Sequence, residues 1–211
     1  MAEKKETEFW NAFSGKHRLG SKRVPVFQVT NRVVALNDQR KLARSDAMET
    51  LMRAVLGQIR EDRGERLAGL VYVMYALERG HPEPLYIGIA EARGQGDALS
   101  RNITAPGFFG RWGYSRYYHM GDLSQAVIHG PGRPKYARWA DELFESDDPP
   151  TLRRDVYFWC GPISELDLDQ AKTASLKQYE KKLITSAAFA YPQLLNVHGR
   201  NGAPRRVPRQ G

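Results

Sequence analysis

The sequence predicts an α+β fold, in which a small, mainly antiparallel sheet of three strands is flanked by helices. Two short runs, 69–75 and 85–89, are rich in β-branched and aromatic residues and lie close enough to form a hairpin. A third run of this kind, 155–160, predicts a buried strand bounded by a Gly-Pro pair. Apolar residues spaced by three and four predict helices at 46–59 and 172–189. This order of elements favours α+β over a doubly wound sheet.

The N-terminal part is expected to be an extension that docks onto this sheet and carries no chemistry of its own. Residues 1–22 are mostly polar and predict a loose arm, in spite of Trp10 and Phe13. Residues 24–30 alternate apolar and polar side chains, which predicts a short edge strand that tolerates Pro25 near its start.

Signals for helix ends accompany the predicted helices. Asp46 and Glu49 offer a capping box for the first amphipathic helix, and Gly64 would stop it. A further helix is predicted at 137–144, where a segment rich in aspartate and proline ends it. The long stretch before that helix, 91–134, is dotted with glycines and aromatic residues.

The hairpin would bring two tyrosines onto one face of the sheet. Its connection contains Gly80 and two prolines, and side chains alternate between faces along each strand. The predicted faces of the first strand are Leu70, Tyr72 and Met74 on one side and Val71, Val73 and Tyr75 on the other. Tyr72 and Tyr86 should therefore meet, and Gly88 would leave the backbone open to a ligand.

Composition points to a basic protein that meets a polyanion. The chain has 211 residues, of which 41% are apolar, and a net charge of +8. No apolar run reaches the roughly 20 residues of a membrane span, no signal peptide is evident, and the single Cys160 suggests a buried thiol, so we expect a cytoplasmic protein. Basic domains of this size commonly bind nucleic acid. The basic clusters are Lys16, Arg18, Lys22 and Arg23; Arg101, Arg111 and Arg116; and Arg200, Arg205, Arg206 and Arg209.

An acidic residue lies in the apolar stripe of the last helix. That stripe consists of Leu176, Tyr179, Leu183, Ile184 and Ala187. Glu180 falls in its middle, where a carboxylate is costly unless it is paired or binds a metal ion. Two interpretations follow: a salt bridge to a buried arginine, or a ligand for Mg²⁺, which often takes only one or two protein carboxylates.

These motifs together resemble the GIY-YIG nuclease family. Leu70-Val71-Tyr72 stands in the place of the first triplet and Tyr86-Ile87-Gly88 in that of the second. The family also implies a catalytic arginine after the hairpin, often with a histidine, then a third strand, a helix with a metal-binding glutamate and a tail that ends in leucine-asparagine. Glu180 and Asn196 match the last two features.

The resemblance implies a catalytic role for each matching residue. Tyr72 and Tyr86 would orient water and phosphate, Glu180 would bind the metal ion, and Asn196 would brace the site by hydrogen bonding. The catalytic arginine would be Arg111, with Arg116 as second choice and Arg101 as third, and it would hold the scissile phosphate. Those not used in this way would contact DNA. His119 would assist proton transfer.

One departure from the family pattern bears on the general base. Where many members carry a lysine after the second triplet, this chain has Glu91, which is either a solvated strand end or a second acid near the site. The general base is left open between Tyr72, His119 and a metal-bound water.

The expected protein is therefore a hydrolase: a Mg²⁺-dependent DNA endonuclease, with Mn²⁺ as a substitute, that cuts double-stranded DNA in a restriction or defence system. A homodimer would supply the two active sites that a double-strand cut needs. The alternative is a non-catalytic nucleic-acid-binding module. The predicted organisation is an N-terminal arm and helical extension at 1–66, a nuclease domain at 67–197 and a basic flexible tail at 198–211, with Arg200, Arg205 and Arg206 on the DNA backbone.

Overall fold

The computed structural model describes residues 1–28, 33–34, 39–40, 43–62, 64, 66–105, 142–147 and 150–203. The helices are α1 (Ala2–Lys16), η1 (Leu19–Ser21), α2 (Asp46–Arg60), η2 (Gln95–Asp97), α3 (Arg101–Thr104), α6 (Glu165–Gln170) and α7 (Leu176–Ala190). The strands are β1 (Val24–Pro25), β2 (Phe27–Gln28), β3 (Val33–Val34), β4 (Gln39–Arg40), β5 (Ala43–Arg44), β6 (Leu67–Glu78), β7 (His81–Glu91), β8 (Phe144–Asp147), β9 (Pro150–Leu152) and β10 (Tyr157–Ser164).

The main sheet is antiparallel and has the strand order β1-β10-β6-β7. It confirms the α+β class, and its three long strands are the three that the sequence predicts. The fourth strand, β1, is only two residues long and pairs Val24 with Phe158 at the outer side of β10. Pro25 is tolerated there because an edge strand leaves some backbone N–H groups without a ladder partner. The predicted edge strand over 24–30 is thus divided, since β2 leaves the main sheet and pairs with β5.

The central hairpin is longer than its apolar runs. β6 and β7 pair from Gly69 opposite Glu91 to Glu78 opposite His81, and only two residues connect the strands. The prediction that Pro82 and Pro84 belong to the connection was wrong: both lie in β7. This strand forms the outer edge of the sheet, where a missing N–H donor costs little.

The strand β10 continues past the Gly-Pro pair that was predicted to end it. The strand runs to Ser164. Gly161 lies inside it, where the Trp159 side chain packs against the glycine. A Cβ atom at Gly161 would lie 2.5 Å from Cζ2 of Trp159, so the indole occupies the space next to the glycine. Cys160, in the same strand, is buried as predicted, and burial raises the pKa of its thiol.

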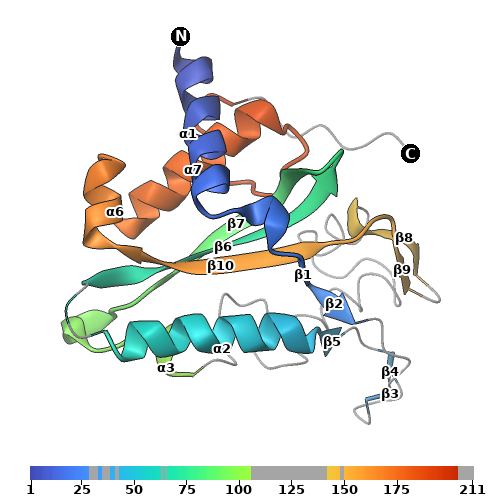
Figure 1. Cartoon of the computed structure of the whole chain (residues 1–211), viewed down its shortest axis with the longest axis horizontal. Coiled ribbons are helices and arrows are strands. Elements are labelled where there is room, and N and C mark those ends of the chain that lie inside the picture. Colours follow the sequence, from blue (N-terminus) through green and yellow to red (C-terminus); the bar gives the residue numbers. More distant parts are fainter. Residues whose placement is uncertain are drawn as a thin grey trace.

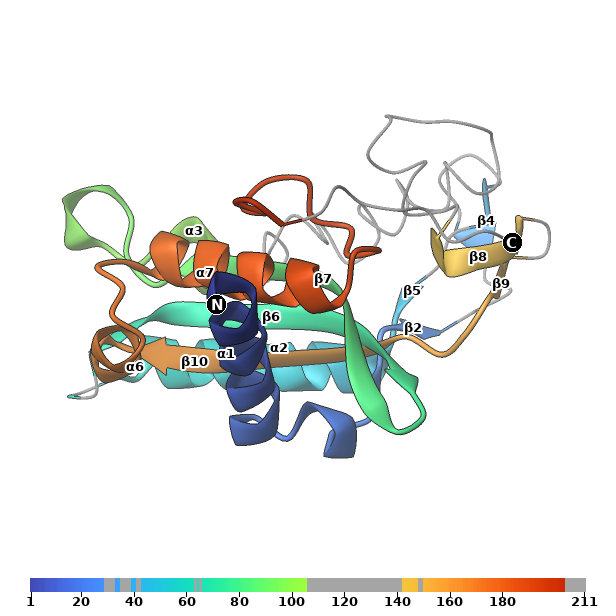
Figure 2. The ribbon, with the colours of Figure 1, turned by 90° about the horizontal axis from the view of Figure 1, so that it is seen from above.

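Helices cover both faces of the sheet. Figure 1 shows α2 along one face and α1 with α7 on the other, and Figure 2 shows α1 crossing beside α7. Leu70, Tyr72 and Met74 belong to the core on the α2 side, whereas Val71, Val73 and Tyr75 belong to the core on the α1 and α7 side. The predicted alternation along β6 is confirmed.

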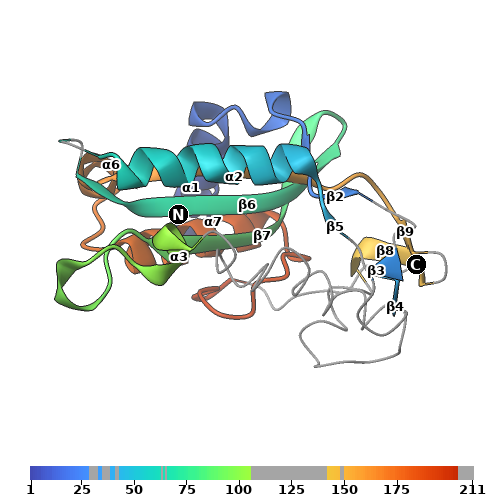
Figure 3. The same cartoon turned by 90° about the horizontal axis from the view of Figure 1, so that it is seen from below.

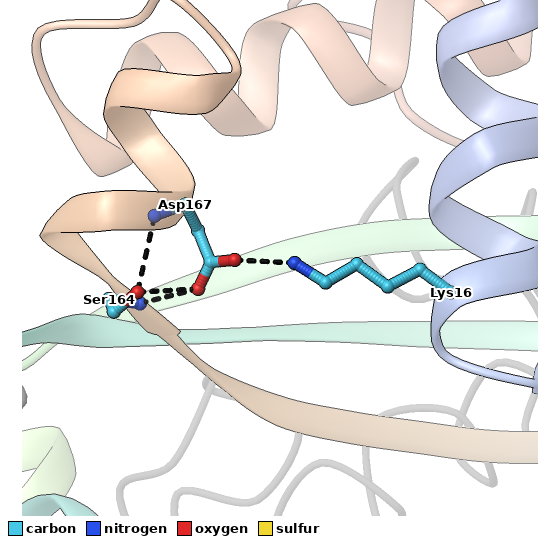
Figure 4. A network of polar contacts seen from close by, with 3 residues as sticks. All are labelled: Lys16, Ser164 and Asp167. Atoms are coloured by element: carbon cyan, nitrogen blue, oxygen red, sulfur yellow. Dashed lines mark hydrogen bonds and ion pairs between the residues drawn. The ribbon is translucent and has the colours of Figure 1, made fainter.

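The predicted loose arm at the N-terminus is instead the helix α1, which completes one of the two cores. Trp10 is fully buried, and Phe13 packs edge-on against Trp159 with ring centroids 5.4 Å apart. At the end of the helix, Lys16 forms an ion pair of 2.5 Å with Asp167, which also closes a capping box with Ser164 at the start of α6 (Figure 4). The arm prediction failed because few apolar residues, all on one side, suffice once a sheet offers them a surface.

We predict that Trp10→Ala lowers the free energy of unfolding by about 3–5 kcal/mol, the usual cost of truncating a buried tryptophan. Urea denaturation followed by circular dichroism measures this change. Asn11→Ala, at an exposed position in the same helix, is the matched control and should change stability by less than about 0.5 kcal/mol. Equal, small effects of both variants would mean that α1 does not form part of the cooperative core.

The helix α2 is confirmed, but its ends differ from the prediction. Its cap is Ser45, whose Oγ accepts a hydrogen bond of 3.0 Å from the Met48 N–H, rather than Asp46. It ends at Arg60, before Gly64.

The helix predicted over 137–144 falls mostly outside the described residues, and the prediction is wrong at Phe144, where β8 begins. Within the described ranges, no helix is both long and apolar enough to cross a membrane.

Candidate functional site

Tyr72 and Tyr86 meet on the α2 side of the sheet, as the hairpin pattern predicts. Their ring centroids are 6.2 Å apart, and their hydroxyls are hydrogen-bonded to each other. Tyr72 is 3% exposed and stacks on Phe158, whereas Tyr86 is only partly buried. The neighbouring strands β6, β7 and β10 therefore fix the inner phenol and leave the outer one accessible.

Both phenols are neutral at physiological pH. Burial, followed by the nearby Tyr86 and Glu180, raises the pKa of Tyr72 well above its ordinary value of 10.0. Burial and then Glu180 raise the pKa of Tyr86 to about 12. Two neutral hydroxyls in series can orient an anionic substrate or a water molecule.

Gly88 has a different task from the predicted one. It lies opposite Tyr72 in the β6–β7 ladder. A Cβ atom at this position would lie 2.3 Å from both the hydroxyl oxygen and Cζ of Tyr72. The glycine thus makes room for the phenol of Tyr72, rather than opening the backbone to a ligand.

We predict that Gly88→Ala displaces the Tyr72 hydroxyl from Tyr86, because a Cβ contact below 3.0 Å requires one of the partners to move. Overpacking of this kind costs about 1–3 kcal/mol. Thermal unfolding measures that cost, and the ultraviolet absorbance of the tyrosines during a pH titration reports their altered ionisation. An unchanged titration curve in the folded variant would show that the ring does not depend on the glycine.

Glu180 lies on the second turn of α7, at the margin of its apolar face rather than in the buried middle. The predicted stripe is buried on the sheet, but α7 runs along the edge strand β7 (Figure 2), so one side of the helix extends past the sheet. Burial and the nearby Glu91 raise the pKa of the half-buried carboxyl to about 7, partly offset by Lys177. Both tyrosines sense its charge, so the three side chains form one electrostatic cluster.

Asn196 holds the edge strand at the second tyrosine. Its Oδ1 accepts a hydrogen bond of 2.9 Å from the Ile87 N–H, and its Nδ2 donates one of 2.8 Å to the Ile87 carbonyl. The amide therefore pairs with β7 as one residue of a further strand would. The Leu195 N–H donates to the Leu85 carbonyl at 2.8 Å. Leu195 and Asn196 together thus hold the backbone of β7 on both sides of Tyr86.

An open cleft of about 870 Å³ brings these residues to the surface. Its walls come from the edge of β7, the first half of α7, the start of α3 and the segment after Asn196. Figure 3 shows α3 beside β7 on the side opposite α7. Tyr86, Glu180 and Asn196 all line this cleft, and Tyr72 lies behind Tyr86.

The cleft also contains charged residues that the sequence analysis did not assign to the site. Lys177 Nζ lies 3.2 Å from Glu91 Oε2, and Lys181 lines the same wall. His198, in the segment that follows Asn196, also lines the cleft. A signal for the lysines was present, since positions 177 and 181 lie within one helical turn of Glu180. The sequence left open whether Glu91 is a solvated strand end or a second acid, and the structure places it at the cleft.

The remaining predicted residues are only partly covered by the structure. Arg111, Arg116, His119, Arg205 and Arg206 lie outside the described residues, so their roles stay predictions. Arg101 is exposed at the first position of α3, and its neighbour Asn102 lines the cleft.

The described start of the predicted tail is attached to the domain. Arg200 donates to the carbonyls of Leu194 and Pro192 at 3.0 and 3.1 Å. Thr185 Oγ1 donates to the Gly199 carbonyl at 2.6 Å. The contact of Arg200 with DNA stays a prediction.

The residues present fit a single hard cation. No hydrogen bond or ion pair reaches the Glu180 carboxylate from the part of the chain that the structure describes. In that part, no group of three or more histidine, cysteine, aspartate or glutamate side chains is placed to hold a metal ion. A Mg²⁺ ion that takes one or two carboxylates and keeps several waters needs no larger group.

Comparison of the chain with protein-family models, with curated proteins and with solved structures gave no match.

Proposed function

We propose that this protein is a metal-dependent DNA endonuclease that hydrolyses phosphodiester bonds. The observation that carries the proposal is the convergence of the Tyr72–Tyr86 pair and the half-buried Glu180 carboxylate at one open cleft. Three separate elements, β6, β7 and α7, supply these groups, and Asn196 braces the strand between them. The resemblance of the sequence motifs to the GIY-YIG family supports the same proposal.

Each side chain of the cluster has a task in this proposal. The Tyr86 hydroxyl, which is hydrogen-bonded to Tyr72, orients the phosphate or the attacking water at the mouth of the cleft. Because both phenols have a raised pKa, they act as neutral hydrogen-bonding groups rather than as phenolates. Arg111 would neutralise charge that develops on the phosphate, and His119 would assist proton transfer.

Glu180 is the residue that would hold the cation. When bound, Mg²⁺ or Mn²⁺ would supply Lewis-acid stabilisation of the phosphate and of the leaving oxygen. Burial and the nearby Glu91 raise the pKa of the Glu180 carboxyl to about 7. The charge of a bound metal ion would favour the ionised form of this carboxyl. Within this class we propose a restriction or defence role, with a homodimer cutting both strands of a duplex.

The decisive experiment incubates supercoiled plasmid with the protein in the presence of Mg²⁺, Mn²⁺ or EDTA. Wild type should nick and linearise the plasmid with either ion and be inactive in EDTA, and Glu180→Ala should be inactive throughout. Cleavage in EDTA would overturn the metal-dependent mechanism. Tight binding of DNA without cleavage under any condition would favour a nucleic-acid-binding module, for which the lysines at the cleft are the supporting observation.

A further inference from the structure

We propose that the Glu91 carboxylate competes with the DNA phosphate for Lys177. It pairs with Lys177 at the cleft until a phosphate of bound DNA replaces the carboxylate. This inference rests on the proposed function, because it assumes that a phosphodiester enters this cleft. It adds a regulatory contact made by two residues at the ends of different elements, β7 and α7.

The backbone positions of the two residues are fixed, whereas their side chains remain accessible. Glu91 is the last residue of β7, where it pairs with Gly69, and its carbonyl accepts a hydrogen bond of 2.6 Å from Ser100 Oγ. Lys177 lies in the first turn of α7. The side chains are 43% and 72% exposed, and their charged atoms are 3.2 Å apart. An incoming anion can therefore reach Lys177 without rearrangement of the backbone.

The location of the pair makes phosphate the natural competitor. Lys177 and Lys181 are one helical turn apart, and both line the cleft together with Glu180. Among the described residues, no ion pair reaches Lys181. A phosphodiester bound beside Glu180 would thus lie near two cations of α7, and one of these cations is paired with Glu91.

The ion pair between Lys177 and Glu91 is weak enough for a DNA phosphate to replace Glu91. Exposed ion pairs are weak, because water and salt screen them. A phosphate that bridges Lys177 and Lys181 offers the same kind of charge-assisted hydrogen bond and releases counterions from the DNA. We therefore expect Glu91 to reduce affinity moderately rather than to block binding.

A double-mutant cycle tests this competition. Binding of a fluorescent DNA duplex is measured by anisotropy in EDTA, where no cleavage is expected, over a range of salt concentrations. The variants are Glu91→Gln, Lys177→Ala and the double variant. Glu8→Gln and Lys4→Ala, which change the same charges at exposed positions of α1, are the controls. Thermal unfolding verifies that each variant is folded.

Competition predicts a specific pattern of affinities. Glu91→Gln should tighten binding about two- to fivefold at low salt, the range expected for an exposed ion pair. Lys177→Ala should weaken binding and reduce the slope of log affinity against log salt by about one. In the Lys177→Ala background, Glu91→Gln should have little effect, since the side chain that it restrains is gone.

Other outcomes overturn the proposal. Equal effects of Glu91→Gln in both backgrounds would show general repulsion of DNA by Glu91 and no competition for Lys177. Unchanged or weaker binding by Glu91→Gln would exclude competition as well. If wild type binds and cuts DNA but either of these results is obtained, only the competition fails, whereas absence of DNA binding by wild type would remove the proposed function together with it.

Discussion

Glu180→Gln is expected to lower metal-dependent cleavage about 10³-fold or more, while making the folded protein more stable above neutral pH. The loss of activity follows because glutamine removes the carboxylate that the cluster of Tyr72, Tyr86 and Glu180 offers to a cation. The gain in stability follows because the folded state disfavours the ionised carboxylate, whose pKa is raised by burial and by Glu91.

The sign of this stability effect follows from the pKa. The carboxyl titrates near its ordinary value of 4.5 in the unfolded chain and at about 7 in the folded protein. The folded state therefore binds more protons between these values, so stability falls as pH rises through this window. Each pKa unit corresponds to about 1.4 kcal/mol, and partial exposure reduces the effect, so we expect Glu180→Gln to gain about 1–2 kcal/mol near pH 8.

Denaturation of wild type and variant at several pH values measures this gain, and a Mg²⁺ titration followed by thermal unfolding adds a readout independent of activity. Mg²⁺ should raise the melting temperature of wild type and leave that of Glu180→Gln unchanged. Glu8→Gln, at an exposed position of α1, should behave as wild type in both measurements. Loss of several kcal/mol in Glu180→Gln would instead indicate a broken structural ion pair.

Tyr72→Phe and Tyr86→Phe are expected to lower turnover about 10²-fold each and to change DNA affinity less than about threefold. Each substitution removes one hydroxyl and retains the ring, so the contacts of Tyr72 with Phe158 survive. The hydrogen bond between the two hydroxyls is lost in either variant. The double variant should therefore lose much less than the product of the single effects.

Single-turnover cleavage and equilibrium binding separate the two quantities. Tyr75→Phe is the matched control, because Tyr75 lies on the same strand but on the opposite face, and its hydroxyl donates to the Leu19 carbonyl at 2.5 Å. It should lose about 1–2 kcal/mol of stability and retain turnover. Equal loss of binding and turnover in the two site variants would assign these tyrosines to holding the substrate.

Local pattern was sufficient for the elements whose side chains repeat regularly. The period of two in β6 identified both faces of the sheet, and the spacing of three and four identified α2 and α7. The pairing of Tyr72 with Tyr86 followed from the hairpin, since neighbouring strands in an antiparallel sheet place facing side chains at predictable positions.

Local pattern failed where a partner distant in the sequence decides the outcome. The helix α1 has few apolar residues, and only the surface around Trp159 makes burial of Trp10 and Phe13 favourable. Gly161 and Pro162 resemble the end of a strand, but the Trp159 ring occupies the space beside the glycine, and β10 continues. In both cases tertiary packing outweighed local propensity.

The sequence by itself determined the α+β class, the face that both tyrosines share and the acidic residue on α7. Only the tertiary structure decided that Glu180 leaves the core for a cleft, because α7 lies over the edge of the sheet rather than its centre. It also decided that Gly88 serves Tyr72 and that Glu91 meets Lys177. Such contacts join residues far apart in the chain, and their geometry depends on how whole elements pack, which no periodicity within one element encodes.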